Sequence, residues 1–222
     1  MKTNLDYQDL QVSLTEWKID LFRYDAYVRS VVLRNLNSAQ KGILAQIAGE
    51  DLSQLGKREI NNLIKRIETI IDDEYERIDK FMAKTGQDLL VTTHQVEMFA
   101  YNEWLGANLF DSLPKYKLEA IKATPLFEGR ALGDWWNKQS NDLKFNIETI
   151  VRNNALIGDS EYSAIKAIRD RFEIVGHDAS TLVRTSWLKV GMVVLLSSKD
   201  IYSWTQTRRG SGLCLHDILA CG

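Results

Sequence analysis

The chain has 222 residues, and 45% of them are apolar, which is enough to build a hydrophobic core in one large domain or two small ones. Its 28 basic and 30 acidic side chains give a formal net charge of -2, which excludes the strong overall positive field of many nucleic-acid-binding proteins. The sequence has neither an apolar leader nor a membrane-length apolar run, and its two cysteines lie together near the end, so we expect a soluble protein of a reducing compartment without a secreted disulfide framework.

The first segment predicts a long amphipathic helix. Apolar residues recur at steps of three and four from Leu14 to Leu36, which is the spacing of one buried helix face. Weak helix formers follow at 35–38, and the apolar pattern then resumes before Gly49. One long helix or two consecutive helices are both compatible with this pattern.

The clearest pattern in the chain is an isoleucine-rich stripe from Ile60 to Met82. It predicts a helix that ends at Gly86, a residue type favoured just beyond helix ends. We interpret this helix as a core helix of an antiparallel bundle. The alternative is an intermolecular coiled coil, for which the stripe supplies a candidate interface at Ile64, Ile67 and Ile71.

A further helix is predicted from Val91 to Leu109, closed by Pro114. His94 falls on its apolar face and is interpreted as a core histidine, because no second His or Cys lies three or four residues away to share a metal. The following stretch holds both prolines and two glycines. It predicts a boundary between an N-terminal long-helix region, 1–126, and a C-terminal unit, 127–222, although a tight connection within one domain is also compatible.

The C-terminal unit is predicted to open with a helix capped by Asp134. The adjacent Trp135 and Trp136 cannot point the same way on a helix. One ring is therefore expected in the core, while the other packs on another element or on a partner protein, so the pair is a second candidate interface.

Two turns are predicted in the last third of the chain. Gly158 suits a helix end, and Asp159 or Ser160 can accept the free N-H groups of the next helix. This helix-turn-helix is interpreted as an ordinary connection rather than a DNA reader, because acidic side chains offset its basic ones. A second turn is predicted at Gly176, with Asp178 capping a final helix.

The end of the chain predicts a strand. Residues 201–207, IYSWTQT, alternate and are rich in aromatic and β-branched side chains, with Trp204 expected to face inward. A glycine turn follows from Arg209. The predicted fold is therefore mainly α, an elongated helical bundle with a small C-terminal β-hairpin or strand-turn element.

Three motifs in this order resemble a known family. They are a Gly-x-Ser turn at Gly158 and Ser160 after Asp134-Trp135-Trp136, a Leu-Val-Arg-Thr sequence containing Arg184 and Thr185, and a tryptophan before an Arg/Ser/Cys turn at Trp204, Arg209, Ser211 and Cys214. The family is that of phage head morphogenesis proteins, also called minor capsid or minor head proteins, of the Mu F-like and SPP1-like type. The resemblance covers residues 132–214.

Two residue-level expectations accompany the resemblance. Relatives usually carry a paired Cys-x-x-Cys in the last turn, whereas this chain has Cys214 with Ser211 at the other position, so we predict no metal site and no cofactor. Arg184 is expected on the inner face of its helix, where its guanidinium would tie that helix to the Trp204 strand and Thr185 would add one short bond. No catalytic residue is predicted.

The resemblance implies a non-enzymatic virion protein, made in the cytoplasm of the bacterial host. It would assemble with the portal protein, the major capsid protein or both during procapsid formation, be present in the mature head and assist DNA packaging or ejection. Self-association and local DNA contact are compatible with this role, whereas a membrane or a small-molecule substrate is not expected. The alternatives are a DNA-contacting virion protein and a host cytoplasmic helical adaptor; an enzyme is disfavoured because the three histidines lie scattered and outside any catalytic motif.

Overall fold

A computed structural model describes the backbone of residues 4–106, 116 and 131–210, and the side chains of residues 8–106, 116 and 131–186. The described chain forms four long helices, α1 (Asn4–Ile47), α2 (Lys57–Leu105), α4 (Leu132–Ile157) and α5 (Glu161–Gly210). A short 3-10 helix, η1 (Leu52–Gln54), lies between α1 and α2. The prediction of a mainly helical fold is confirmed, and none of the described helices is long and apolar enough to cross a membrane.

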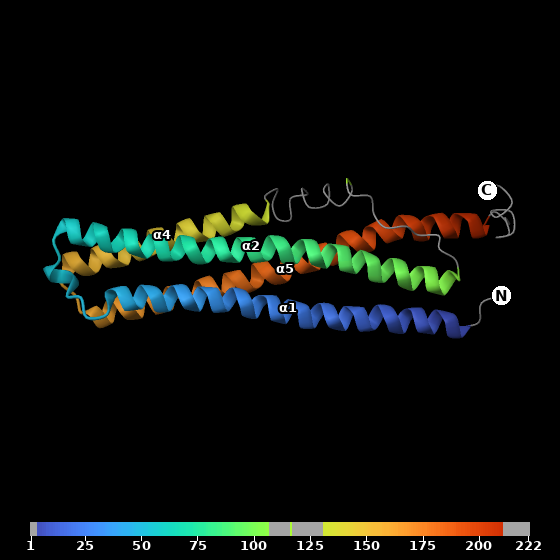
Figure 1. The fold of residues 1–222 in the computed structure, drawn as a ribbon, viewed down its shortest axis with the longest axis horizontal. Coiled ribbons are helices and arrows are strands. Elements are labelled where there is room, and N and C mark those ends of the chain that lie inside the picture. The colour runs from blue at the N-terminus through green and yellow to red at the C-terminus, as the bar shows by residue number, and fades with distance from the viewer. Residues whose placement is uncertain (1–3, 107–115, 117–130, 211–222) are drawn as a thin grey trace.

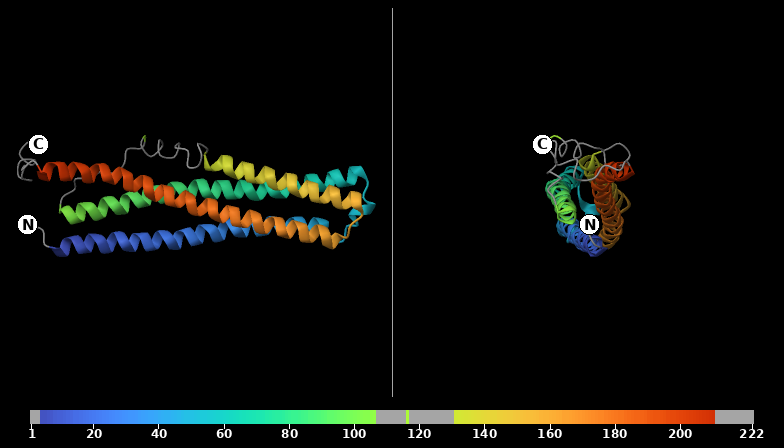
Figure 2. Two further views of the ribbon diagram at one scale, coloured as in Figure 1. Left: turned by 180° about the vertical axis from the view of Figure 1, so that it is seen from behind. Right: turned by 90° about the vertical axis from the view of Figure 1, so that its right-hand side faces the viewer.

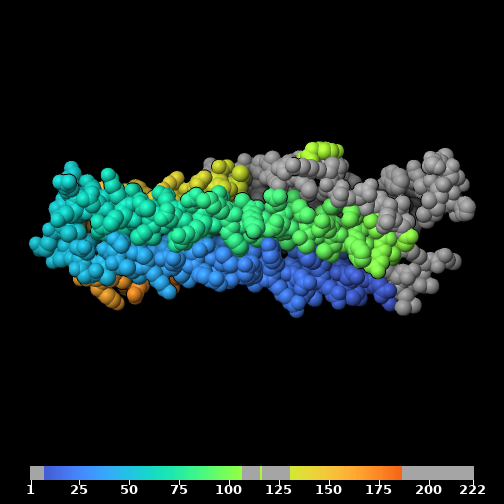
Figure 3. Space-filling model, viewed as in Figure 1, coloured from blue at the N-terminus to red at the C-terminus, as the bar shows by residue number. Residues whose placement is uncertain are grey.

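The helices form an elongated bundle (Figure 1). Each of α1 and α4 runs antiparallel to the helix that follows it, and the neighbours around the bundle are α1, α2, α4 and α5 in that cyclic order (Figures 1 and 2). Figure 3 shows α1 and α2 side by side along one face. We call the end that holds residues 48–56 and 158–160 the turn pole, and the opposite end the open pole.

One hydrophobic core runs along the bundle and draws on all four helices. Its fully buried side chains include Val32, Ile43, Ile67, Ile71, Leu143, Ile147, Ile168 and Val183. The helices on both sides of the predicted boundary at 126/127 thus share one core; the boundary itself lies in residues 117–130, outside the described part. The interpretation of the isoleucine stripe as a core helix is confirmed.

The helices are longer than the sequence patterns predicted. Helix α1 is continuous, so the first apolar segment forms one long helix and not two consecutive helices. Gly86 lies inside α2, so the predicted stop there is wrong; the helix ends instead at Gly106, whose left-handed backbone has φ 65°. The two separate stripes that were predicted to form two helices are therefore two parts of one 49-residue helix.

The predicted turn at Gly176 and the cap at Asp178 are also wrong, because both residues lie inside α5. A Cβ atom on Gly176 would lie 3.4 Å from Leu33 Cδ2 of α1, which is an ordinary van der Waals contact. A single glycine inside a helix costs about 1 kcal/mol relative to alanine. The buried residues around it, Phe172, Val175 and Ala179, pack in the core and keep this part of α5 helical.

The predicted C-terminal strand is not found either. Residues 201–207 belong to α5, which continues to Gly210. The preceding residues, 197–200, contain no glycine or proline to stop the helix, and strand propensity depends strongly on context. The later part of the predicted turn, including Ser211 and Cys214, lies outside the described residues.

The turn between α4 and α5 agrees with the sequence. Gly158 has φ 69° and ψ 31°, and its N-H donates to the carbonyl of Asn154 at 3.1 Å. The Ser163 N-H donates to Ser160 Oγ at 3.3 Å, which caps the start of α5. Asp134 is the third helical residue of α4 rather than its cap, and its carboxylate accepts the N-H of Ala131 at 3.3 Å.

Because left-handed backbone is strained for a residue with a Cβ atom, we predict that Gly158→Ala lowers the free energy of unfolding by about 1 kcal/mol. Gly158→Asn is the matched control and should lower the free energy of unfolding less, since asparagine tolerates the left-handed conformation better than alanine. Urea denaturation followed by circular dichroism measures both. Equal stability of the alanine variant and the native chain would contradict the proposed cap.

Candidate functional site

The structure does not gather the family-type motif residues into one site. Gly158 and Ser160 form the turn at the turn pole, whereas Arg184 is exposed on α5 and Trp204 lies further along the same helix. Twenty residues of helix separate Arg184 from Trp204, or about 30 Å, which no side chain spans. The predicted tether is therefore wrong. The Thr185 Oγ1 hydroxyl donates to the Thr181 carbonyl at 2.8 Å, a bond within its own helix.

The remaining motif residues also lie apart. Asp178 is on the surface of α5, where one carboxylate oxygen lies 3.7 Å from His177 Nδ1. Arg209 is in the last turn of α5, and Cys214 lies outside the described residues. Within the described part of the chain, no group of three His, Cys, Asp or Glu side chains is arranged to hold a metal ion.

The two tryptophans divide as expected for neighbours on a helix. Trp136 is buried in the core, so it is not available to a partner. The ring of Trp135 is partly buried, and the Lys138 ammonium lies 5.9 Å from its centroid. The isoleucines of the candidate interface, Ile64, Ile67 and Ile71, are buried as well, because they face the other helices of this same chain.

A polar layer interrupts the apolar core where α2 carries Glu74 and Tyr75. Glu74 is buried, and its Oε1 atom accepts hydrogen bonds from the Ser38 hydroxyl of α1 at 2.9 Å and from the Arg77 guanidinium at 2.8 Å. These donors offset part of the cost of removing the carboxylate from water, while its second oxygen, Oε2, is buried without a hydrogen-bond partner. Glu74 therefore joins α2 to α1 by a charged hydrogen bond.

Tyr75 extends this layer to the other two helices. Its hydroxyl donates to Gln139 Oε1 of α4 at 3.1 Å, and Gln139 Nε2 donates to the Val175 carbonyl of α5 at 3.3 Å. Burial raises the pKa of Tyr75 well above its ordinary value, so the hydroxyl keeps the proton that it donates. Two adjacent residues of α2 thus connect to all three other helices.

Sequence reasoning missed this layer, although the sequence holds a signal. Glu74 follows Ile71 by three residues and precedes Ile78 by four, which places a charged residue on the core face of the isoleucine stripe. A charge at such a position requires a buried partner. The identity of that partner, Ser38, depends on how α1 packs and is not visible in the local pattern.

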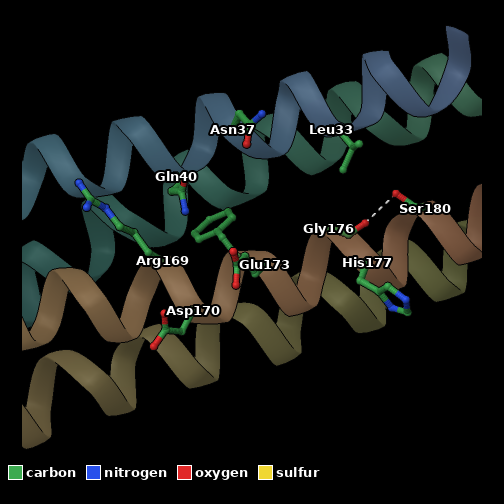
Figure 4. Close-up of a pocket in the computed structure, with 10 residues that line it drawn as sticks. Leu33, Asn37, Gln40, Arg169, Asp170, Glu173, Gly176, His177 and Ser180 are labelled. Atoms are coloured by element: carbon green, nitrogen blue, oxygen red, sulfur yellow. Dashed lines mark hydrogen bonds between the residues drawn. The ribbon is translucent and has the colours of Figure 1, made fainter. Parts of the chain in front are cut away.

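A groove of about 740 Å³ lies between α1 and α5 (Figure 4). Gln40 and Leu33 point from α1 toward α5, while Asp170 and His177 of α5 point away from α1. The charged side chains of its wall, Arg169, Asp170 and Glu173, are exposed. The groove is thus a solvated furrow along a helix-helix contact and lacks the buried, converging polar groups typical of a ligand pocket.

The surface of the bundle carries large apolar side chains outside this groove. The most exposed are Leu156 and Ile157 at the turn pole, with 83% and 79% of their surface accessible, and Tyr162 follows on the first turn of α5. Others lie along the helices: Val12, Ile19, Phe22, Tyr27, Phe99, Phe145 and Ile174. Such side chains are characteristic of protein contact surfaces when they cluster.

One buried acid lies toward the open pole. Glu97 of α2 is 8% exposed, and burial raises its pKa to about 7, while the Lys18 ammonium of α1 acts in the opposite direction. Between the ordinary value of 4.5 and about 7, the folded chain holds a proton that the unfolded chain releases. The contribution of Glu97 to stability is therefore greatest below pH 4.5 and falls as the pH rises through this window.

We predict that Glu97→Gln leaves stability nearly unchanged at pH 5 and raises the free energy of unfolding at pH 8 by an amount on the order of 2–3 kcal/mol, because the amide carries no charge to bury. Urea denaturation at the two pH values measures this difference. Glu173→Gln, at an exposed position of α5, is the matched control. A gain for Glu97→Gln of the same size at both pH values would contradict the assignment.

The Tyr75 hydroxyl gives a second prediction. Tyr75→Phe keeps the ring but removes the donor to Gln139, and should lower the free energy of unfolding by about 1–2 kcal/mol. Tyr162→Phe, at an exposed tyrosine, should have no measurable effect. If the two substitutions have the same effect in thermal unfolding, the hydrogen bond does not stabilise the layer.

Comparisons with known proteins add no relative. No protein-family model, no curated protein and no solved structure matches this chain significantly.

Proposed function

We propose that this chain is a structural protein of a phage head, a minor head protein that assembles with the portal protein, the major capsid protein or both. The motifs of residues 132–214 support the family, and the large apolar side chains exposed along the bundle support a role in assembly. The protein would be made in the bacterial cytoplasm and remain in the virion.

The surface that best suits such a contact is the turn pole. Leu156 and Ile157 are adjacent and almost fully exposed, and Tyr162 presents a third large side chain close in sequence. Hydrogen bonds hold the supporting backbone, including one from the Gly49 N-H to Glu161 Oε1 at 3.1 Å. Apolar side chains on an ordered turn lose little conformational entropy when a partner covers them.

This proposal replaces the interfaces expected from the sequence. The isoleucine stripe and Trp136 supply the core, so the contact with a portal or capsid protein must use residues outside it. Leu156, Ile157 and Tyr162 are our candidates. Phe99, an equally large exposed side chain near the end of α2, offers a control position away from the turn pole.

Co-expression with the cognate portal and major capsid proteins tests the proposal. We expect the full chain to elute with at least one of them from a sizing column at micromolar concentration. The double substitution Leu156→Ser and Ile157→Ser should weaken this complex at least about tenfold, whereas Phe99→Ser should not. Separation of the native chain from both proteins would overturn the function, and binding by the double variant would overturn the role of the turn pole.

A further inference from the structure

Helix α1 has a second row of large side chains besides its core face. Val12, Ile19 and Phe22 are 55%, 47% and 70% exposed, and Thr15 and Ala26 between and beyond them are exposed too. The spacing of the five residues alternates three and four, which is the a and d spacing of a coiled-coil seam. We call Val12, Thr15, Ile19, Phe22 and Ala26 the α1 seam.

The same row continues toward the turn pole, where α5 covers it. Leu33 and Gln40 follow Ala26 at steps of seven, and both line the furrow between α1 and α5. Toward the open pole α5 rises away from α1, and α2 lies between them in the view of Figure 1. The helix face that packs on α5 at one end is therefore uncovered at the other, where the row is most apolar.

We propose that the α1 seam binds the α1 seam of a second copy of this chain, with the two helices antiparallel. In an antiparallel pair related by a twofold axis between Ile19 and Phe22, Ile19 of each copy faces Phe22 of the other. On either side of this central contact, Thr15 of one copy faces Ala26 of the other. The result is a short hydrophobic contact made twice by the same residues, as in other isologous dimers.

The charges beside the seam select this orientation. Glu16 and Arg23 are exposed on the same flank, and the antiparallel register brings Glu16 of one copy beside Arg23 of the other, twice. A parallel pair would instead place Lys18 of one copy beside Arg23 of the other, two like charges. Within one chain, Arg23 bonds Asp20 at 3.1 Å, but both groups are exposed and such pairs contribute little, so Arg23 is available to a partner.

The length of the seam sets the strength of the dimer. From Val12 to Ala26 the helix rises about 21 Å, which is short for a coiled coil. The contact is therefore smaller than a typical stable interface, and we expect a dimer that dissociates on dilution.

Sedimentation of the full chain alone, over a range of concentrations, tests the proposal. The native chain should show a monomer-dimer equilibrium, and the double substitution Ile19→Ser and Phe22→Ser should weaken dimerisation at least about tenfold. Phe145→Ser, at an exposed position of α4, is the matched control and should dimerise like the native chain. Circular dichroism shows whether each variant keeps its helices, which we expect because the changed side chains are exposed.

A charge exchange tests the orientation. Glu16→Arg and Arg23→Glu should each weaken self-association, because each creates two like-charged contacts. An equimolar mixture of the two variants should restore it, because all four groups then face opposite charges. Failure of the mixture to associate would overturn the antiparallel arrangement.

Other occupants of the seam give distinct results. A native chain that stays monomeric at every concentration overturns the proposal. If the seam variant then loses portal or capsid binding, the seam belongs to that partner instead. The self-association measurements themselves need no capsid component. Absence of self-association would therefore not contradict the proposed function. Absence of portal or capsid binding would not contradict the proposed dimer.

Discussion

The hydrogen bonds of Glu74 and Tyr75 fix the axial register of the four helices. Apolar contacts alone are non-directional, so helices lined by isoleucine, leucine and valine can shift along one another at modest cost. Glu74 bonds Ser38 of α1, and Tyr75 reaches α5 through Gln139 of α4. A shift of α2 against α1 by one helical turn would remove the Ser38 donor and leave the buried carboxylate with only Arg77 of its own helix, which is more costly. We interpret this layer as the element that selects one register.

The bundle differs between its two ends because its helices differ in length. Helix α4 has 26 residues, whereas α1, α2 and α5 have 44, 49 and 50. Near the turn pole all four helices surround the core. Beyond Leu132, where α4 begins, α5 moves away from α1, and this leaves the α1 seam uncovered. Helix length thus determines both where the core is complete and where the surface is apolar.

Local patterns in the sequence predicted the helices and the Gly158 turn, because helical spacing and left-handed glycines depend on neighbouring residues alone. They failed where a distant contact decides. Gly176 predicts a turn, yet α5 runs through it, because the buried Phe172, Val175 and Ala179 around it pack on the other helices. Arg184 was expected inside, although Val183 beside it is the buried residue and a helix turns by about 100° at each step. The partners of Glu74 and the path of α5 depend on tertiary packing, so no local pattern contains them.

The two short connections at the turn pole have a consequence for the order of folding. Residues 48–56 join α1 to α2, and residues 158–160 join α4 to α5, so each pair can form a hairpin through contacts close in sequence. Such contacts cost little loop-closure entropy and form early. The contact of α1 with α5 instead joins the first and last helices of the bundle, and its closure is expected late. The polar furrow beside Gln40 and Arg169 marks one of the lines along which the two hairpins meet; α2 and α4 form another.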